Sequence, residues 1–164
     1  MKQLLSLLIF SVLLNSSVLN KDKNIDIELV SFGLYKKIKI IDIRKVDTNE
    51  KIIENQLTKV EVKHLKTVDL IKPEIGTNFG LEFKLLGTNN GDKVNLTVVH
   101  NHPEMTLDSG KKVSVQYYNT KKSFNDIHHC NMLFENDYEL ISGIWNIQIF
   151  NNDIKILEKS FTLK

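Results

Sequence analysis

The sequence predicts an all-β protein, a single antiparallel β-sandwich of the immunoglobulin-like or fibronectin-like type with about 7–9 strands. Short segments alternate apolar and polar residues with a period of two, and turn residues separate them every ten or so positions. No amphipathic helix pattern competes, and alanine, the best helix former, is missing from all 164 residues. A closed β-barrel is the alternative architecture that the same pattern allows.

The first residues have the pattern of a secretory signal peptide. Lys2 precedes an apolar run from Leu4 to Leu14, and small polar residues follow it. The run is too short for a membrane-spanning helix, which needs roughly 20 apolar residues, and no second apolar stretch follows. We therefore predict a signal peptide over residues 1–19 and one β-sandwich domain over residues 20–164. This processed chain would be periplasmic or secreted and would have no transmembrane segment.

The first half of the domain alternates strands with polar turns. The pattern over residues 25–43 predicts one long strand or two short ones. The stretch Arg44–Thr58 is polar and charged, so we expect a mobile loop there. Residues 59–63 follow as a half-exposed strand, and Pro73 and Gly76 then force a turn.

The second half contains two predicted hairpins. Residues 78–87 and 93–102 flank an Asn-Gly pair, which is the strongest short signal for a β-hairpin. The turn Asn151–Asp153 indicates a second hairpin at the C-terminus. The remaining strands are predicted over residues 111–118, 127–134, 141–150 and 154–163. In a sandwich the bulky side chains along these segments would form the core, namely Phe79, Phe83, Trp145, Phe150 and Phe161.

Composition and motifs exclude several function classes. The net charge of +2 is small, and the lysines form no basic stripe interleaved with aromatic residues, so no nucleic-acid partner is expected. The chain has neither a GxSxG nucleophile motif nor a phosphate-binding glycine loop. Cys130 is the only cysteine, so no intramolecular disulfide can form. We therefore expect a protein that is not an enzyme and that is held together by its core.

Two short His/Cys pairs suggest one specific chemistry. His100 and His102 are two residues apart, and so are His128 and Cys130, so on strands each pair would lie on one face of its sheet. If the two strands were neighbours, three imidazoles and one thiolate would meet, a ligand set suited to zinc or copper. Four protein ligands leave no open coordination position, so such a site would bind or sense metal rather than catalyse a reaction.

A structural interpretation of the same histidines is also open. His100 continues the alternating row of Val94, Leu96 and Val98, so its ring can simply end the core face of a strand. Pro103 would end that strand and disrupt the pair geometry. The choice depends on whether His128 and Cys130 come within reach of the first pair.

Several aromatic and glycine motifs, taken as a set, resemble the uncharacterised family of exported bacterial domains called domain of unknown function DUF3859. They are FGLY at Phe32–Tyr35, IKPEIGTNFGLEFKL at Ile71–Leu85, HP at His102–Pro103, YELISGIWNIQI at Tyr138–Ile149 and EKSF at Glu158–Phe161. The resemblance implies a small exported sandwich domain with no established activity, so it brings no functional residues to carry over.

These observations together predict a non-enzymatic binding or interaction module of the bacterial envelope. Its partner would be an unknown envelope or extracellular protein, contacted through loops or an exposed sheet edge. The alternative is a periplasmic zinc- or copper-binding protein that uses His100, His102, His128 and Cys130. In the first case no cofactor is expected.

Overall fold

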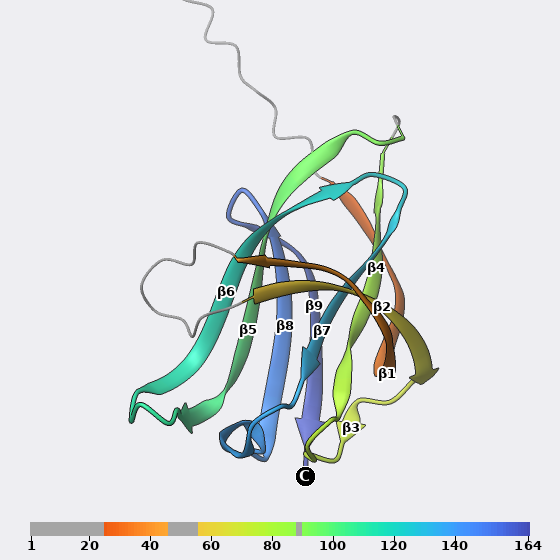
Figure 1. The fold of residues 1–164 in the computed structure, drawn as a ribbon. Coiled ribbons are helices and arrows are strands. Elements are labelled where there is room, and N and C mark those ends of the chain that lie inside the picture. The colour runs from red at the N-terminus through yellow and green to blue at the C-terminus, as the bar shows by residue number, and fades with distance from the viewer. Residues whose placement is uncertain (1–24, 46–55, 88–89) are drawn as a thin grey trace, which may run out of the picture.

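The computed structural model describes residues 25–45, 56–87 and 90–164, which form two β-sheets packed face to face (Figure 1). The four-stranded sheet has the order β2-β1-β4-β7 and the five-stranded sheet the order β3-β9-β8-β5-β6. The elements are β1 (Asp26–Lys45), β2 (Gln56–Lys66), β3 (Leu70–Ile71), β4 (Asn78–Leu86), β5 (Lys93–Thr106), β6 (Lys112–Ser123), β7 (Ile127–Leu133), the 3-10 turn η1 (Asp137–Glu139), β8 (Gly143–Asn151) and β9 (Ile154–Leu163). The predicted all-β sandwich is confirmed.

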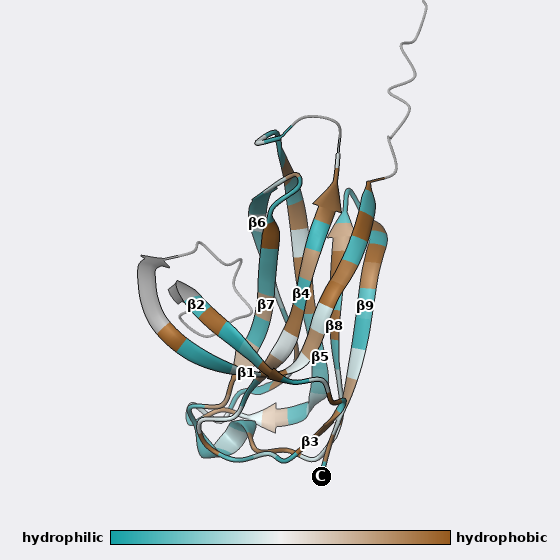
Figure 2. Cartoon of the chain, turned by 90° about the vertical axis from the view of Figure 1, so that its right-hand side faces the viewer, coloured by the Kyte–Doolittle hydropathy of each residue, from teal (hydrophilic) through white to brown (hydrophobic). Residues whose placement is uncertain are grey.

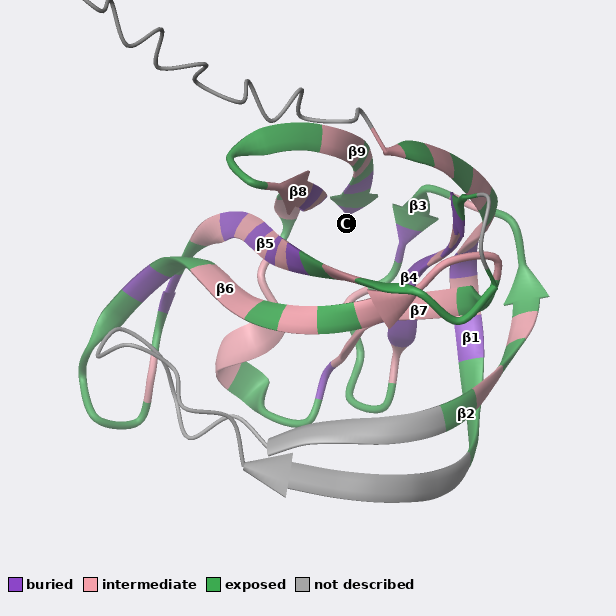
Figure 3. Ribbon diagram, turned by 90° about the horizontal axis from the view of Figure 1, so that it is seen from above, coloured by how far each residue is buried: buried purple, intermediate pink, exposed green. Residues whose placement is uncertain are grey.

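The period of two in the sequence appears directly as alternating burial. Every second residue is buried in β5 from Leu96 to His102, in β4 from Leu81 to Leu85 and in β8 from Trp145 to Ile149 (Figure 3), and Figure 2 shows the alternation in hydropathy. In these segments one face lies against the opposite sheet, while the other face is more exposed. All strand pairs are antiparallel except the short β3, which lies parallel to β9 and was not predicted.

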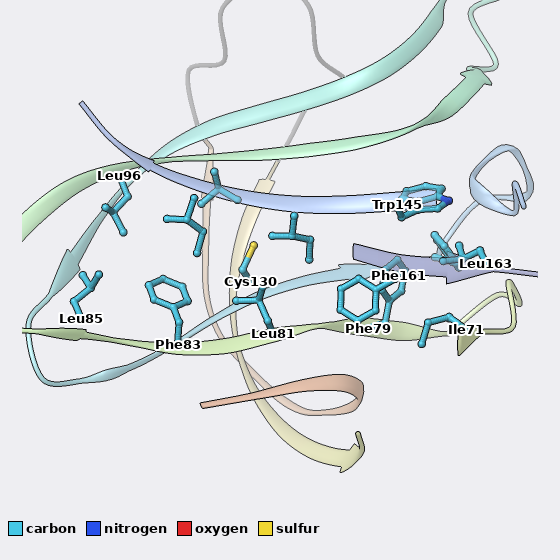
Figure 4. Packing of buried hydrophobic residues seen from close by; sticks show 14 residues of the cluster. Ile71, Phe79, Leu81, Phe83, Leu85, Leu96, Cys130, Trp145, Phe161 and Leu163 are labelled. Atoms are coloured by element: carbon cyan, nitrogen blue, oxygen red, sulfur yellow. The ribbon is translucent and has the colours of Figure 1, made fainter. Parts of the chain in front are cut away.

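The core lies between the two sheets and contains aromatic residues from both (Figure 4). Phe79 contacts three other aromatic rings, with its ring centroid 5.1 Å from that of Phe161, 5.4 Å from that of Phe134 and 6.1 Å from that of Trp145. Each fully buried side chain of this size stabilises the fold by roughly 1.5–3 kcal/mol through the hydrophobic effect. The prediction for Phe150 was wrong, because its side chain is only partly buried on the outer face of β8.

The predicted hairpin of residues 78–87 and 93–102 does not form. The turn is present, with Gly91 at φ +86°, but β4 pairs with β1 and β7, whereas β5 pairs with β6 and β8. The apolar faces of β4 and β5 meet across the sandwich instead of lying side by side in one sheet. An Asn-Gly signal predicts a reversal of the chain but not which strands pair after it.

The C-terminal hairpin is confirmed. β8 and β9 pair from Gly143 to Asn151, and Asn152 and Asp153 between them have φ values of +44° and +64°. Two successive residues with positive φ are characteristic of the type I′ turn, whose twist matches that of paired strands.

Pro103 does not end β5, which continues to Thr106. The pairing with β6 shifts between Asn101 and Met105, so Pro103 lies in a bulge, where its missing N–H is not needed. Its ring packs on Gly143, where an added Cβ would lie 2.6 Å from Pro103 Cγ.

Some predictions concern residues outside the described part of the chain. The signal peptide is one of them. Of the predicted loop Arg44–Thr58, the ends are strand, because β1 extends to Lys45 and β2 starts at Gln56, and residues 46–55 are not described. Across the residues that are described, no helix is long and apolar enough to span a membrane.

Candidate functional site

The four predicted metal ligands all point into the sandwich, but from opposite sheets. His100 and His102 are buried on the inner face of β5, while His128 and Cys130 lie on the inner face of β7. The two-residue spacing therefore correctly placed each pair on one face of a strand. Since β5 and β7 belong to different sheets, the pairs face each other across the core.

Only His100 and Cys130 meet. His100 Nε2 lies 3.3 Å from Cys130 Sγ, and the hydroxyl of Tyr118 on β6 lies 3.6 Å from the same sulfur. The His100 and Tyr118 rings are in edge-to-face contact at 5.9 Å. Three polar groups from three strands thus satisfy one another inside the core, as most buried polar groups in proteins do.

The other two histidines have partners elsewhere. His102 donates from Nδ1 to the carbonyl oxygen of Pro103 at 2.8 Å, and its ring stacks on Trp145 at 4.8 Å. His128 donates from Nε2 to the carbonyl oxygen of Ser123 at 2.7 Å and packs against Phe83.

The predicted four-ligand metal site is therefore not assembled. Within the described residues, no group of three or more His, Cys, Asp or Glu side chains is placed to hold a metal ion. The physical reason is that β5 and β7 belong to opposite sheets of the sandwich, and of the four side chains only His100 and Cys130 make contact across the core.

Burial makes the His100–Cys130 pair electrically neutral. Desolvation lowers the pKa of His100 from 6.5 to about 4, with a smaller contribution from His102. Desolvation also raises the pKa of the Cys130 thiol to about 11, although Tyr118 and Lys122 oppose the shift. A catalytic Cys–His pair needs a thiolate beside an imidazolium, so this pair lacks the charges required of a nucleophile.

The thiol should accordingly be unreactive in the folded protein. With a pKa of about 11 and almost no solvent access, we expect Cys130 to react with an aromatic disulfide reagent at pH 8 at least about 100-fold more slowly than in the urea-unfolded chain. The measurement is the absorbance of released thiolate with and without urea. Equal rates would show an exposed or activated thiol and contradict the assignment.

A second polar cluster, which we did not predict, lies on the outer face of the four-stranded sheet. Ser31 Oγ donates to Glu82 Oε2 at 2.6 Å and lies 2.8 Å from the Tyr35 hydroxyl. His129 Nδ1 lies 3.1 Å from Glu82 Oε1, so the carboxylate is enclosed by side chains from β1 and β7. Tyr35 is 3% exposed, and its burial raises its pKa to about 12.

Pairing of β1 with β4 explains why the sequence did not reveal this cluster. Ser31 pairs with Glu82 across a bulge in β1, although 51 residues separate them. The alternation indicated only that His129 points away from Cys130. Tyr35 lies in the motif FGLY and Glu82 in the motif NFGLEF. Their presence in these motifs was the one feature of the sequence that pointed to the cluster.

Ser31, Glu82 and His129 are not arranged as the catalytic triad of an acyl-transfer enzyme. In a Ser-His-acid triad the imidazole lies between the hydroxyl and the carboxylate and takes the proton from the hydroxyl. Here Glu82 lies between Ser31 and His129, and Ser31 donates directly to the carboxylate. Burial also lowers the pKa of His129, against the opposing effect of Glu82. The cluster therefore links β1 to β4 through the Ser31–Glu82 hydrogen bond and brings His129 of β7 against the same carboxylate.

Comparison with known proteins decides the family. The model of the family described as "Domain of unknown function (DUF3859)" matches residues 23–163. The chain belongs to the DUF3859 family. The match confirms the resemblance that the sequence motifs indicated, and it covers nearly all of the chain after the predicted signal peptide. No curated protein matches the chain in sequence.

A solved structure supports the fold. The DUF3859 domain is similar to an immunoglobulin-like protein from Pseudomonas aeruginosa, with a TM-score of 0.59 and 17% sequence identity over 85% of this chain and 97% of that one. At this identity the similarity shows the fold alone. The chain also has a weaker similarity to a Pseudomonas fluorescens alkylpurine DNA glycosylase bound to DNA with an abasic-site analogue. The TM-score is 0.36 at 13% identity, over 58% of this chain and 28% of that one, so this similarity bears on neither fold nor function.

Most motif residues of this DUF3859 domain support the fold. Phe79, Trp145 and Phe161 are buried in the core, where the rings of Trp145 and Phe161 both contact that of Phe79. Lys159 Nζ lies 3.7 Å from the centroid of the Phe32 ring, a cation–π contact that covers the core edge. The HP and SGIW motifs meet where Pro103 packs on Gly143.

Proposed function

We propose that this DUF3859 protein is a non-enzymatic binding domain of the bacterial envelope that recognises a partner protein along the edge strand β6. The observation that carries the proposal is the open edge of β6. Among the described residues β6 pairs with β5 alone, so its other side presents unpaired backbone groups over a strand of 12 residues.

The side chains of β6 leave this edge unprotected at its centre. Proteins commonly block edge strands with lysines or other charges, because an open edge pairs with foreign strands. In β6 the lysines lie at the ends, at Lys112, Lys121 and Lys122, and residues 113–120 carry no charge. Val115 is 44% exposed in this uncharged stretch. An extended segment of a partner can therefore add to the sheet by backbone hydrogen bonds.

Two further observations support a binding role. The buried His100–Cys130 pair is neutral, and the Glu82 carboxylate is occupied by Ser31, so neither cluster supplies a free nucleophile and base. The expected signal peptide supports an exported location, and immunoglobulin-like sandwiches are frequent interaction scaffolds.

Photo-crosslinking in the producing cells tests the proposal. A photoreactive amino acid at Val115 should give one discrete adduct, whereas the same probe at Ile144, which is 57% exposed on β8 of the same sheet, should give none. Asn119→Lys, which places a charge at the centre of the edge, should abolish the Val115 adduct. No adduct at Val115, or the same products from both positions, would overturn the proposal.

A further inference from the structure

The β1–β2 hairpin is a two-stranded ribbon over most of its length. β1 pairs with β4 only from Asp26 to Leu34, and from there to Lys45 it pairs with β2 alone. This part of the two strands extends past β4 and crosses the view in Figure 1. An isolated two-stranded ribbon is marginally stable in water. Contact with another surface would therefore stabilise the ribbon.

Exposed lysines are concentrated where the ribbon leaves the sheet. Among the ribbon side chains that are described (35–38 and 61–66), four are lysines and Glu61 is the one acid. The four lysines are all exposed: Lys36, Lys37, Lys63 and Lys66. None of them forms an ion pair with a described side chain.

Two of these four lysines repel each other when no partner is bound. Lys36 and Lys63 are direct cross-strand partners, and side chains at such positions have Cβ atoms about 4.5–5.5 Å apart. Like charges directly opposite each other destabilise a pair of strands. A negatively charged partner removes this repulsion, so the ribbon is complementary to an anion.

Exposed aliphatic side chains accompany the lysines. Ile38 is 55% exposed and Leu65 is 56% exposed, and each is two residues from a member of the Lys36–Lys63 pair. Single exposed aliphatic residues are ordinary on protein surfaces. Here two of them accompany four exposed lysines on one ribbon, which is the combination that binds the interface of a charged membrane.

We propose that the β1–β2 ribbon docks on the surface of an anionic phospholipid membrane. Lys36 and Lys63, which lie directly opposite each other on one face of the ribbon, would contact the headgroup phosphates, while Ile38 and Leu65 enter the boundary between headgroups and acyl chains. An extended surface fits better than one small anion, because the lysines are distributed over both strands. The ribbon and β6 are different elements, so this inference and the proposed partner site can fail independently.

Vesicle co-sedimentation of the processed chain (residues 20–164) tests the inference. We expect binding to vesicles of phosphatidylcholine with phosphatidylglycerol in equal parts, little binding to phosphatidylcholine alone, and a loss of at least about tenfold between low and high salt. Lys36→Gln/Lys63→Gln should weaken binding by about tenfold. The matched control Lys93→Gln/Lys111→Gln has the same net charge and should bind within about twofold of the wild type.

A second variant separates docking from folding. Lys63→Glu places opposite charges on the directly paired positions 36 and 63, so the ribbon should be at least as stable as in the wild type while binding is lost. Ile38→Ser/Leu65→Ser should reduce binding without changing its salt dependence. Equal binding to neutral and anionic vesicles, equal effects of the two glutamine double variants, or no vesicle binding by the wild type would each overturn the inference.

Discussion

Lowering the pH from 7 to 4 should reduce the folding stability of the protein by about 3 kcal/mol through His100 alone. The folded pKa of His100 is about 4, whereas the value in the unfolded chain is 6.5. As the pH falls below 6.5, the unfolded chain binds a proton that the folded chain does not, so unfolding becomes progressively more favourable. Below the folded pKa both states carry the proton, and this loss stops growing.

The variant His100→Phe isolates this contribution. It keeps a ring against Tyr118 but cannot titrate, so its free energy of unfolding should fall less steeply between pH 6.5 and pH 4 than that of the wild type. Urea denaturation at a series of pH values measures both slopes. Tyr118→Phe is the control, because burial raises the pKa of Tyr118 far from the acid range, and its slope should match the wild type. A His100→Phe slope equal to that of the wild type would show that another group dominates.

Local pattern predicted the elements of this fold, whereas pairing between distant strands determined the sites. Alternation in β5 and β7 was enough to place His100 and Cys130 on inner faces. It carried no information on which sheet each strand joins, so it did not show that the two correctly oriented pairs lie in opposite sheets. The wrong prediction of a β4–β5 hairpin has the same cause. The alternation shows that each strand has one apolar face, but it does not show which strand packs on that face.

The outer Ser31–Glu82 cluster illustrates the same limit. No spacing rule connects residues 51 positions apart, and the contact exists because a bulge in β1 aligns Ser31 with Glu82. Pro103 is the opposite case, where a reliable local rule failed. A proline normally excludes a strand interior, but the bulge opposite β6 removes the need for its N–H, so β5 continues.

Gly80→Ala should destabilise the protein by about 3 kcal/mol, because the central strand β4 has no room for a side chain there. A Cβ at this position would lie 2.2 Å from the carbonyl oxygen of Cys130 and 2.6 Å from the Cα of Asn131, both on β7. These are backbone atoms inside a sheet, so the clash cannot be relieved by turning a flexible side chain. Either β4 or β7 must shift, and the hydrogen bonds between them then lengthen.

The control Gly91→Ala separates this packing effect from the general effect of removing a glycine. Gly91 has a φ of +86°, but no atom lies within 4 Å of its added Cβ, so only backbone strain of about 1 kcal/mol is expected. The free energy of unfolding in urea should therefore fall about three times as far for Gly80→Ala as for Gly91→Ala. Because β4 and β7 also hold Glu82 and His129 at 3.1 Å, the shift in Gly80→Ala should also perturb the chemical shifts of the His129 ring, whereas Gly91→Ala should leave them unchanged. Equal losses of stability in the two variants would show that β7 yields to the methyl group and that the close approach of the two strands contributes little to the fold.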